Sequence, residues 1–240
     1  HLSFDAVDPA GTVNSAVYDL IGTVYGATLP YEQYLGGELL QEVAVYVSDH
    51  SRMNFAEDGL AVDDPSIRSA TMPHLQAVRG AVRVLQQAHL PFGVITRRQL
   101  DSLASCRLII LPNLLRMDRE EVEAFRRYVT GGGRLYASRH TSLTDVSGTR
   151  HSTFMLGEVF GCRPEGEYAG LLVYLDPRDA ELSAAIAPQT SVGHARAGDG
   201  TTGALRVSAL PGARVLATVS LPYAAPHEGS PGGLRILTRR

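Results

Sequence analysis

Four short strand candidates, separated by longer stretches, most constrain how this chain can fold. They are Val43–Val47, Phe92–Thr96, Leu108–Pro112 and Arg134–Ser138. Each is bounded by polar or turn-forming residues, a pattern typical of strands. Amphipathic helices are predicted between the first two and between the last two. Strands joined through helices pair in parallel, so we predict an α/β fold of three layers, in which helices cover both faces of a mostly parallel sheet.

The two intervening helices carry start and stop signals. The first is predicted from about His74 to His89, ahead of a proline. The second covers residues 118–130, with Asp118 as N-cap and acidic residues in its first turn. The triple glycine 131–133 ends it. The apolar side chains that we expect this helix to pack on the sheet are Val122, Phe125 and Val129.

The two ends of the chain differ from this α/β part. Apolar residues at helical spacing predict a short leading helix from about Thr12 to Thr28, followed by an irregular connection through Pro30 and Tyr31. The stretch from 49 to 71 shows no regular period. After about residue 160 the chain becomes β-rich, with strand candidates at Leu171–Leu175 and Val215–Val219. These candidates either finish the sheet as antiparallel edge strands or form a small β appendage.

Charge and composition narrow the classes of partner. A formal net charge of −3 predicts no strong attraction to nucleic acid or to an anionic membrane. No apolar run approaches the roughly 20 residues of a membrane helix. The chain has 2 cysteines and no Asn-x-Ser/Thr acceptor sequence, which favours a cytoplasmic location. Lysine is absent, so chemistry that depends on a lysine amine is excluded.

Polar residues follow each of the four predicted strands. In an open α/β sheet, ligands bind beyond the carboxyl ends of the strands, so these loops are candidates for ligand binding or for an interface. The candidate residues are Asp49, His50, Asn54, Arg97, Arg98, Asn113, Arg139 and His140. The same residues also fit ordinary solvated loop tips, because loops are polar for solubility alone.

Several activities known for sheets of this type need residues that this sequence does not have. A glutaminase needs a nucleophilic cysteine on a sharp strand-to-helix turn, whereas Cys106 precedes its strand and Cys162 lies in a Gly-rich connection. The loop Ser48–Arg52 has no glycine to cradle a phosphate. No His-x-His or His-Glu-x-x-His occurs, and His227-Glu228 is an isolated pair. We therefore assign no catalytic residue, no metal site and no cofactor.

Six stretches, taken in order, resemble the middle, trimerisation domain of the family 42 β-galactosidases and their relatives. They are Tyr31–Glu38, Val43–Gly59, Pro91–Thr96, Leu108–Asn113, Asp118–Val122 and Tyr128–Ser138. Each piece alone is unspecific, but the ordered set is much more specific. The resemblance implies a flavodoxin-like sheet of the class I glutamine amidotransferase type, without the glutaminase residues.

The resemblance also implies a domain organisation. Residues 1–36 correspond to the last helix and linker of a preceding TIM-barrel domain, 37–225 to the trimerisation domain, and 226–240 to a truncated tail or the start of a small β domain. The catalytic glutamates of that family lie in the barrel, so none is carried over to this sequence. Since the chain begins at His1 and not at Met, we expect it to be cut from a longer protein.

The function implied by the resemblance is that of a non-catalytic structural or oligomerisation domain of a β-galactosidase-like glycoside hydrolase. Its expected partners are the barrel of the same chain and further copies of itself, which are expected to form a trimer. One alternative is a small-ligand or sugar-binding α/β domain that uses the strand-end loops, although tryptophan, the best side chain for stacking on a sugar, is absent. Another is a degenerate amidotransferase-like enzyme that uses one of the cysteines.

Overall fold

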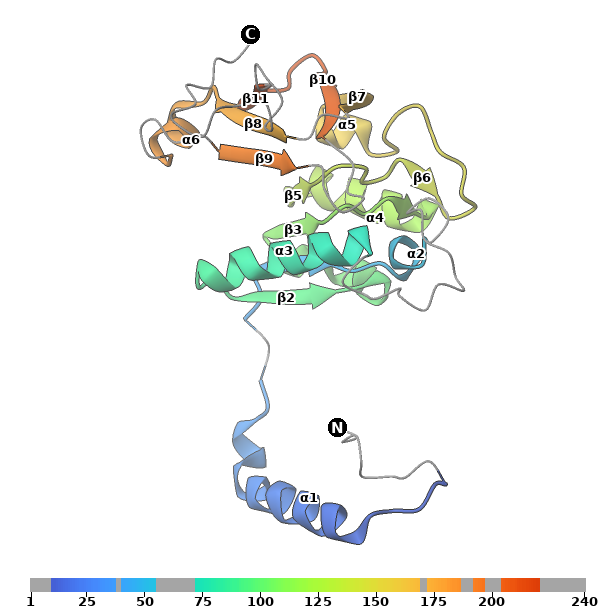
Figure 1. Ribbon diagram of the computed structural model, residues 1–240, viewed down its shortest axis with the longest axis vertical. Helices are drawn as coiled ribbons and strands as arrows, with labels where there is room; N and C mark the ends of the chain where they lie inside the picture. Colours follow the sequence, from blue (N-terminus) through green and yellow to red (C-terminus); the bar gives the residue numbers. More distant parts are fainter. Residues whose placement is uncertain are drawn as a thin grey trace, which may run out of the picture. The chain divides into compact units, whose positions relative to one another are not determined.

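The computed structural model describes residues 10–37, 40–54, 72–168, 172–186, 192–196 and 204–220 (Figure 1). The chain divides into two compact units, His1–Leu40 and Gln41–Arg240. The predicted tail over 226–240, the pair His227-Glu228 and residues 55–71 of the polar stretch lie outside the described residues. Within the described part, no helix has the length and the apolar character needed to span a membrane.

The first unit contains helix α1 (Ser15–Thr28) and the 3₁₀ helix η1 (Leu29–Tyr34). The helix begins a little later than expected, because the side chain of Asn14 caps it by accepting a hydrogen bond from the N–H of Val17 at 3.3 Å. The connection expected to be irregular is instead helical, since the fixed φ of Pro30 suits the first turn of a helix. Neither element contains a buried residue.

The second unit contains a four-stranded sheet whose strands are all parallel, as predicted. The strands are β1 (Val43–Tyr46), β2 (Phe92–Ile95), β3 (Leu108–Leu111) and β5 (Arg134–Ala137). Their order is β2-β1-β3-β5. Because the strands are parallel, their carboxyl ends meet at one edge of the sheet, and the loops that hold the candidate residues all begin there.

Helices cover both faces of this sheet. On one face, Val45 and Ile110 pack with Leu85 of α3 (Pro73–Gln87). On the other face, Tyr46 and Ile109 belong to a larger cluster built with α4 (Arg119–Thr130) and the 3₁₀ helix η2 (Arg97–Ser105). Successive side chains of a strand point to opposite faces, so each short strand contributes to both layers. The prediction of an α/β fold with helices on both sides is confirmed.

Helix α4 starts as its sequence predicts. The side chain of Asp118 accepts a hydrogen bond from the N–H of Glu121 at 2.7 Å, and the side chain of Glu121 accepts one from the N–H of Asp118 at 2.8 Å. This reciprocal capping box satisfies two backbone donors that a helix start otherwise leaves unpaired. The predicted inner face is confirmed, because Val122 and Phe125 are buried and Val129 packs against the same cluster.

Three glycines end α4, each in a different environment. Gly131 is the C-cap, and Gly132 has a φ of +95°. A Cβ on Gly133 would lie 2.3 Å from the ring of Tyr128. That ring is held in place, since the Tyr128 hydroxyl donates a hydrogen bond to the carbonyl of Cys106 at 3.0 Å. The end of the helix is therefore packed tightly between the strands that it connects.

The chain from Cys162 onward forms antiparallel sheets. Strand β7 (Cys162–Tyr168) pairs with β10 (Ala204–Ala209), and β8 (Leu172–Pro177) lies between β9 (Val192–Arg196) and β11 (Ala217–Ser220). Strands β8 and β11 correspond to the two predicted strand candidates, whereas β7, β9 and β10 were not predicted. Among the described strands, neither sheet is paired with β5, so this region, here called the β appendage, does not extend the parallel sheet (Figure 1).

Short elements complete the second unit. They are α2 (Asp49–Arg52), α5 (Gly157–Phe160), α6 (Ala180–Ala184), and the parallel pair β4 (Arg116–Met117) and β6 (Thr144–Asp145). The turn α2 lies in the stretch predicted to be irregular, because one helical turn leaves no periodicity to detect. An apolar cluster joins the β appendage to the rest of the unit. Its members are Leu115, Leu143, Phe154, Phe160, Cys162 and Leu205.

Candidate functional site

The eight candidate residues all follow the carboxyl ends of the parallel strands, but the structure does not gather them into one cluster. Because the strand order is β2-β1-β3-β5, the loops after β1 and β2 lie along one half of the carboxyl edge of the sheet. The loops after β3 and β5 lie along the other half. Two of the candidates are joined directly, since the N–H of His140 donates a hydrogen bond to Oδ1 of Asn113 at 3.3 Å. Asp49 and Arg97, by contrast, pair with residues outside the predicted set.

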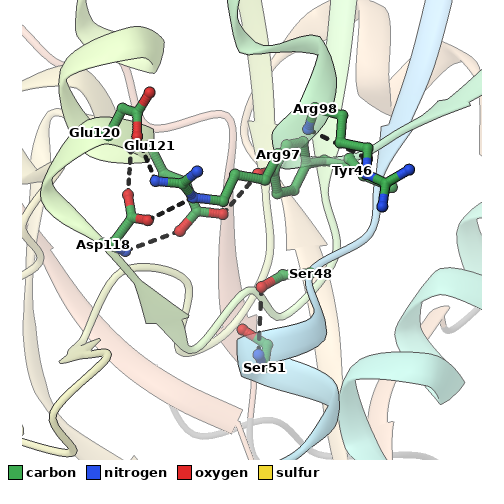
Figure 2. Close-up of polar contacts among 9 residues, drawn as sticks. Tyr46, Ser48, Ser51, Arg97, Arg98, Asp118, Glu120 and Glu121 are labelled. Carbon is green, nitrogen blue, oxygen red and sulfur yellow. Dashed lines mark hydrogen bonds and ion pairs between the residues drawn. The ribbon is translucent and has the colours of Figure 1, made fainter.

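The candidates Arg97 and Arg98 behave differently (Figure 2). Nε of Arg97 lies 2.7 Å from Oδ2 of Asp118, and its guanidinium also pairs with Glu120. Partial burial alone would raise the pKa of Asp118, but the N–H of Glu121 and the Arg97 guanidinium together hold it below its usual range. Arg98 points away from these carboxylates. Arg97 therefore ties the loop after β2 to the start of α4.

A buried carboxyl group lies behind this surface pair. Glu121 is 0% exposed, and its Oε1 accepts a hydrogen bond from the hydroxyl of Tyr46 at 2.6 Å (Figure 2). Burial raises the pKa of Glu121, while the hydrogen bonds from Tyr46 and from the Asp118 backbone act in the opposite direction. Both carboxylate oxygens of Glu121 thus have protein donors. The sequence identified Glu121 only as a residue of the first turn.

A second buried polar group, His74, was also missed as a contact residue. Its Nε2 accepts a hydrogen bond from the N–H of Ser48 at 3.1 Å, and its Nδ1 lies 2.8 Å from the carbonyl oxygen of Pro112. These partners require a neutral ring that carries its proton on Nδ1. Burial lowers the pKa of His74, which favours that neutral form. Since both ring nitrogens are occupied by backbone groups, His74 fastens the ends of β1 and β3 to α3.

The hydroxyl groups near α2 are likewise engaged in structural hydrogen bonds. Oγ of Ser48 accepts a hydrogen bond from the N–H of Ser51 at 3.3 Å and so caps the turn (Figure 2). Oγ of Ser51 is 3.0 Å from both the carbonyl oxygen and the amide nitrogen of Arg116 in β4. These contacts hold the loop after β1 against the loop after β3.

The candidates in the loop after β1 have little chemistry in common. Asp49 and His50 are exposed, and Asp49 pairs with Arg52 at 3.1 Å on the surface. Asn54 is buried, and its side-chain amide makes no hydrogen bond among the described residues. An exposed acid and a buried amide do not form the paired carboxyl groups that glycoside hydrolysis ordinarily uses.

The candidates after β3 and β5 form a compact loop structure. Asn113 and Arg139 both have a left-handed φ, +47° and +50°. The N–H of Asn113 donates a hydrogen bond to Oγ of Ser138 at 2.9 Å. His140 is largely buried, with Nε2 at 2.8 Å from Oε1 of Glu167 on β7. Glu167 lies in a strand that the sequence did not predict, so this contact could not be anticipated.

Two further chemistries can be examined on the described residues. Cys106 is buried just before β3, at the edge of the sheet opposite the candidate loops. Cys162 is partly buried at the start of β7, and burial raises the pKa of its thiol, which disfavours the nucleophilic thiolate. Over the described ranges, no group of three or more His, Cys, Asp or Glu side chains is arranged to hold a metal ion.

Comparison with known proteins adds a fold relationship. No family model matches the sequence, and no curated protein matches it either. Among solved structures, α-L-fucosidase isoenzyme 2 from Paenibacillus thiaminolyticus is similar, with a TM-score of 0.56 and 22% identity over 91% of this chain and 29% of that chain. The β-galactosidase from Rahnella sp. R3 is also similar, with a TM-score of 0.59 and 21% identity over 89% of this chain and 30% of that chain.

A third similar structure is Gan42B, a GH42 β-galactosidase from G. stearothermophilus, with a TM-score of 0.57 and 18% identity over 92% of this chain and 30% of that chain. The chain thus spans about 30% of the length of these proteins. At such identities the likeness establishes a common fold. This chain therefore has the fold of a segment of larger glycoside hydrolases, GH42 β-galactosidases among them.

Proposed function

We propose that this chain is a non-catalytic, oligomerisation domain of a cytoplasmic β-galactosidase-like glycoside hydrolase, with the flavodoxin-like layout of class I glutamine amidotransferases. The observation that carries the proposal is the structural likeness, which covers 91%, 89% and 92% of this chain but only 29%, 30% and 30% of the three hydrolases. In this proposal a trimer is the assembled state, and the bond-cleaving residues belong to another domain of the parent enzyme.

The contacts at the strand ends support the non-catalytic part of the proposal. Glycoside hydrolysis ordinarily needs two carboxyl groups that flank one bond. The carboxyl groups of Asp118 and Glu121 serve the capping box, and Glu121 is additionally bound by Tyr46. His74 has both nitrogens bound to backbone groups. All three side chains are therefore engaged in contacts that stabilise the fold.

The apolar surface of the first unit supports a preceding domain as partner. Helix α1 and η1 contain no buried residue, yet they carry many exposed large apolar side chains. These include Leu20, Val24, Leu29 and Tyr34. Such a surface marks an interaction site or an aggregation risk. We propose that residues 1–36 end a TIM-barrel domain, that 37–225 form the oligomerisation domain and that 226–240 begin a further segment.

The function is tested with nitrophenyl galactosides, fucosides and arabinosides. We expect no turnover from this chain and turnover from the parent enzyme that contains it. Turnover by the chain alone that disappears in Asp49→Asn would contradict the proposal, because it would make the loop after β1 an active site. A gene that encodes no barrel ahead of residue 1 would contradict it as well.

The proposal that another domain covers the exposed apolar surface of α1 has a separate test. The 240-residue chain should bind a hydrophobic dye and self-associate, and Leu20→Glu with Val24→Glu should reduce both effects. The parent enzyme should show neither. A chain that stays monomeric and binds no dye would show that no partner is needed to cover α1.

A further inference from the structure

A largely buried polar contact joins the loop after β5 to the β appendage. His140 follows β5, and its side chain is 12% exposed. Its Nε2 lies 2.8 Å from Oε1 of Glu167, which belongs to β7. Arg150, in the loop after β6, approaches the same carboxylate oxygen at 3.7 Å. This contact and the apolar cluster that contains Phe154 and Cys162 both connect β7 to the strand-end loops of the parallel sheet.

The loop holds His140 in a fixed position. Its N–H donates a hydrogen bond to Oδ1 of Asn113 at 3.3 Å. The neighbouring Thr141 is buried, and its hydroxyl donates to the carbonyl of Ser138 or of Leu111, at 2.8 and 3.1 Å. Because this loop is anchored to the parallel sheet, His140 cannot follow β7 if that strand moves away. Separation of the two parts therefore exposes the imidazole to solvent.

The charged groups that face His140 come from three segments. Glu167 on β7 favours the protonated imidazole, whereas Arg139 in the same loop and Arg150 after β6 disfavour it. Burial is the largest influence, and it too disfavours the charged ring, so that the pKa of His140 is held below its usual range. At neutral pH the closed contact accordingly contains a neutral imidazole beside the Glu167 carboxylate.

We propose that the contact between His140 and Glu167 is an acid-sensitive latch that holds β7, and with it β10, against the parallel part of the molecule. Once β7 has moved away, His140 is in solvent and titrates near its ordinary value of about 6.5. The open form then binds a proton more readily than the closed form. Opening should become more favourable as the pH falls through about 6.5, by at most about tenfold at pH 5.5.

Hydrogen exchange of the 240-residue chain at pH 7.5 and 5.5, corrected for intrinsic exchange, tests the latch. We expect protection of β7 and β10 amides to fall at pH 5.5 by more than that of β1 and β3 amides. His140→Gln, which keeps a neutral amide donor but cannot titrate, should remove this extra loss. The matched control His151→Gln should retain it, because His151 lies beside Asp145 at 3.7 Å and has no described contact with β7.

A second variant separates the titrating group from its partner. Glu167→Gln should weaken protection of β7 at both pH values but leave the extra loss at pH 5.5, since burial and the two arginines still act on His140. Three outcomes overturn the latch: no extra loss in the unmodified chain, an equal extra loss in His140→Gln, or an acid response shared equally by β1 and β3. Retained protection of β1 and β3 at pH 7.5 shows that each variant is folded.

Discussion

The parallel sheet is built from four-residue strands and the β appendage from strands of four to seven residues, yet it is the shorter strands that contain the buried side chains. Every buried residue of the described chain falls between Ala44 and Leu156. In the β appendage, by contrast, Val207 on β10 is 51% exposed, and Val215 and Val219 are also exposed. The parallel strands lie between two helical layers, whereas the described side chains of the appendage strands contribute Cys162 and Leu205 to one small apolar cluster.

This difference teaches that strand pairing and core formation are separate contributions to stability. A parallel sheet must be covered on both faces because its crossover helices lie there, and the burial that results supplies most of the free energy of folding. An antiparallel sheet can leave one face to solvent. We therefore expect the parallel part to be the most stable region of the chain and the β appendage to open first.

The largest effect should come from the centre of the parallel part. Phe125 is 0% exposed, and its ring centroid lies 5.1 Å from that of Tyr46, at an interplanar angle of 81°. Phe125→Ala should lower the free energy of unfolding by roughly 3–5 kcal/mol in urea titrations. Tyr174→Ala on β8, at a partly buried site of the appendage, should cost clearly less. Equal costs, or a loss below about 1 kcal/mol for Phe125, would remove the contrast between the two regions.

A smaller effect is expected from the buried hydroxyl of Tyr46. Tyr46→Phe removes the donor to Oε1 of Glu121 and leaves a buried carboxylate oxygen unpaired. The expected loss is about 1–3 kcal/mol, measured by the same titration. Tyr136→Phe is the matched control, since Tyr136 is 59% exposed on β5 and should tolerate the change. A loss in Tyr46→Phe no larger than that of the control would show that solvent reaches Glu121.

The third effect depends on pH. The pKa of His74 is lower in the folded chain than in the unfolded one, so its contribution is complete above about pH 6.5 and is lost as the pH falls below that value. At pH 5.5 the loss is at most about 1.4 kcal/mol. The raised pKa of Glu121 has the opposite effect on the free energy of unfolding as the pH falls. The unmodified chain is therefore compared with His74→Gln, whose free energy of unfolding should change less between pH 8 and 5.5. If the free energies of unfolding of the two proteins changed equally with pH, His74 would not be the group responsible.

The smallest effect should come from the appendage surface. Val207→Ala on β10 removes methyl groups that are already half exposed. The free energy of unfolding should change by less than about 0.5 kcal/mol. A loss above about 1 kcal/mol would indicate that a further segment or another copy of the chain covers this face, and a dependence of that loss on protein concentration would identify a second copy.

The sequence predicted the parallel part well because its signals are local. The apolar runs give β1, β2, β3 and β5, and Asp118 marks the start of α4. Strand β7 was missed because Pro164 and Gly166 interrupt it, and both residues weaken a strand prediction. The structure tolerates the proline beside an irregularity in register between Arg206 and Val207 on β10. That irregularity depends on the partner strand, so no local pattern reveals it.

The polar network at the strand ends was predicted only in part. The position of these loops follows from the order of strands and helices, which explains why all eight candidates lie at one edge. Their partners do not follow from it. Tyr46 and Glu121 are 75 residues apart in the sequence, and His74 contacts Ser48 and Pro112 from a helix that was assigned only an apolar stripe. Side-chain partners across such separations are set by packing, which local patterns do not encode.

The glycine run after α4 has a consequence for how this protein can vary. A methyl group on Gly131 would lie 3.4 and 3.5 Å from the carbonyl oxygens of Arg127 and Tyr128, which are ordinary contact distances. Alanine should therefore be accepted at this position. Gly132 has open space around it, but its φ of +95° restricts it to residues that tolerate a left-handed backbone. Gly133 is restricted by the Tyr128 ring. A saturation library would therefore return three different substitution profiles from three identical neighbours, and only the third should be relieved by a second change, at Tyr128.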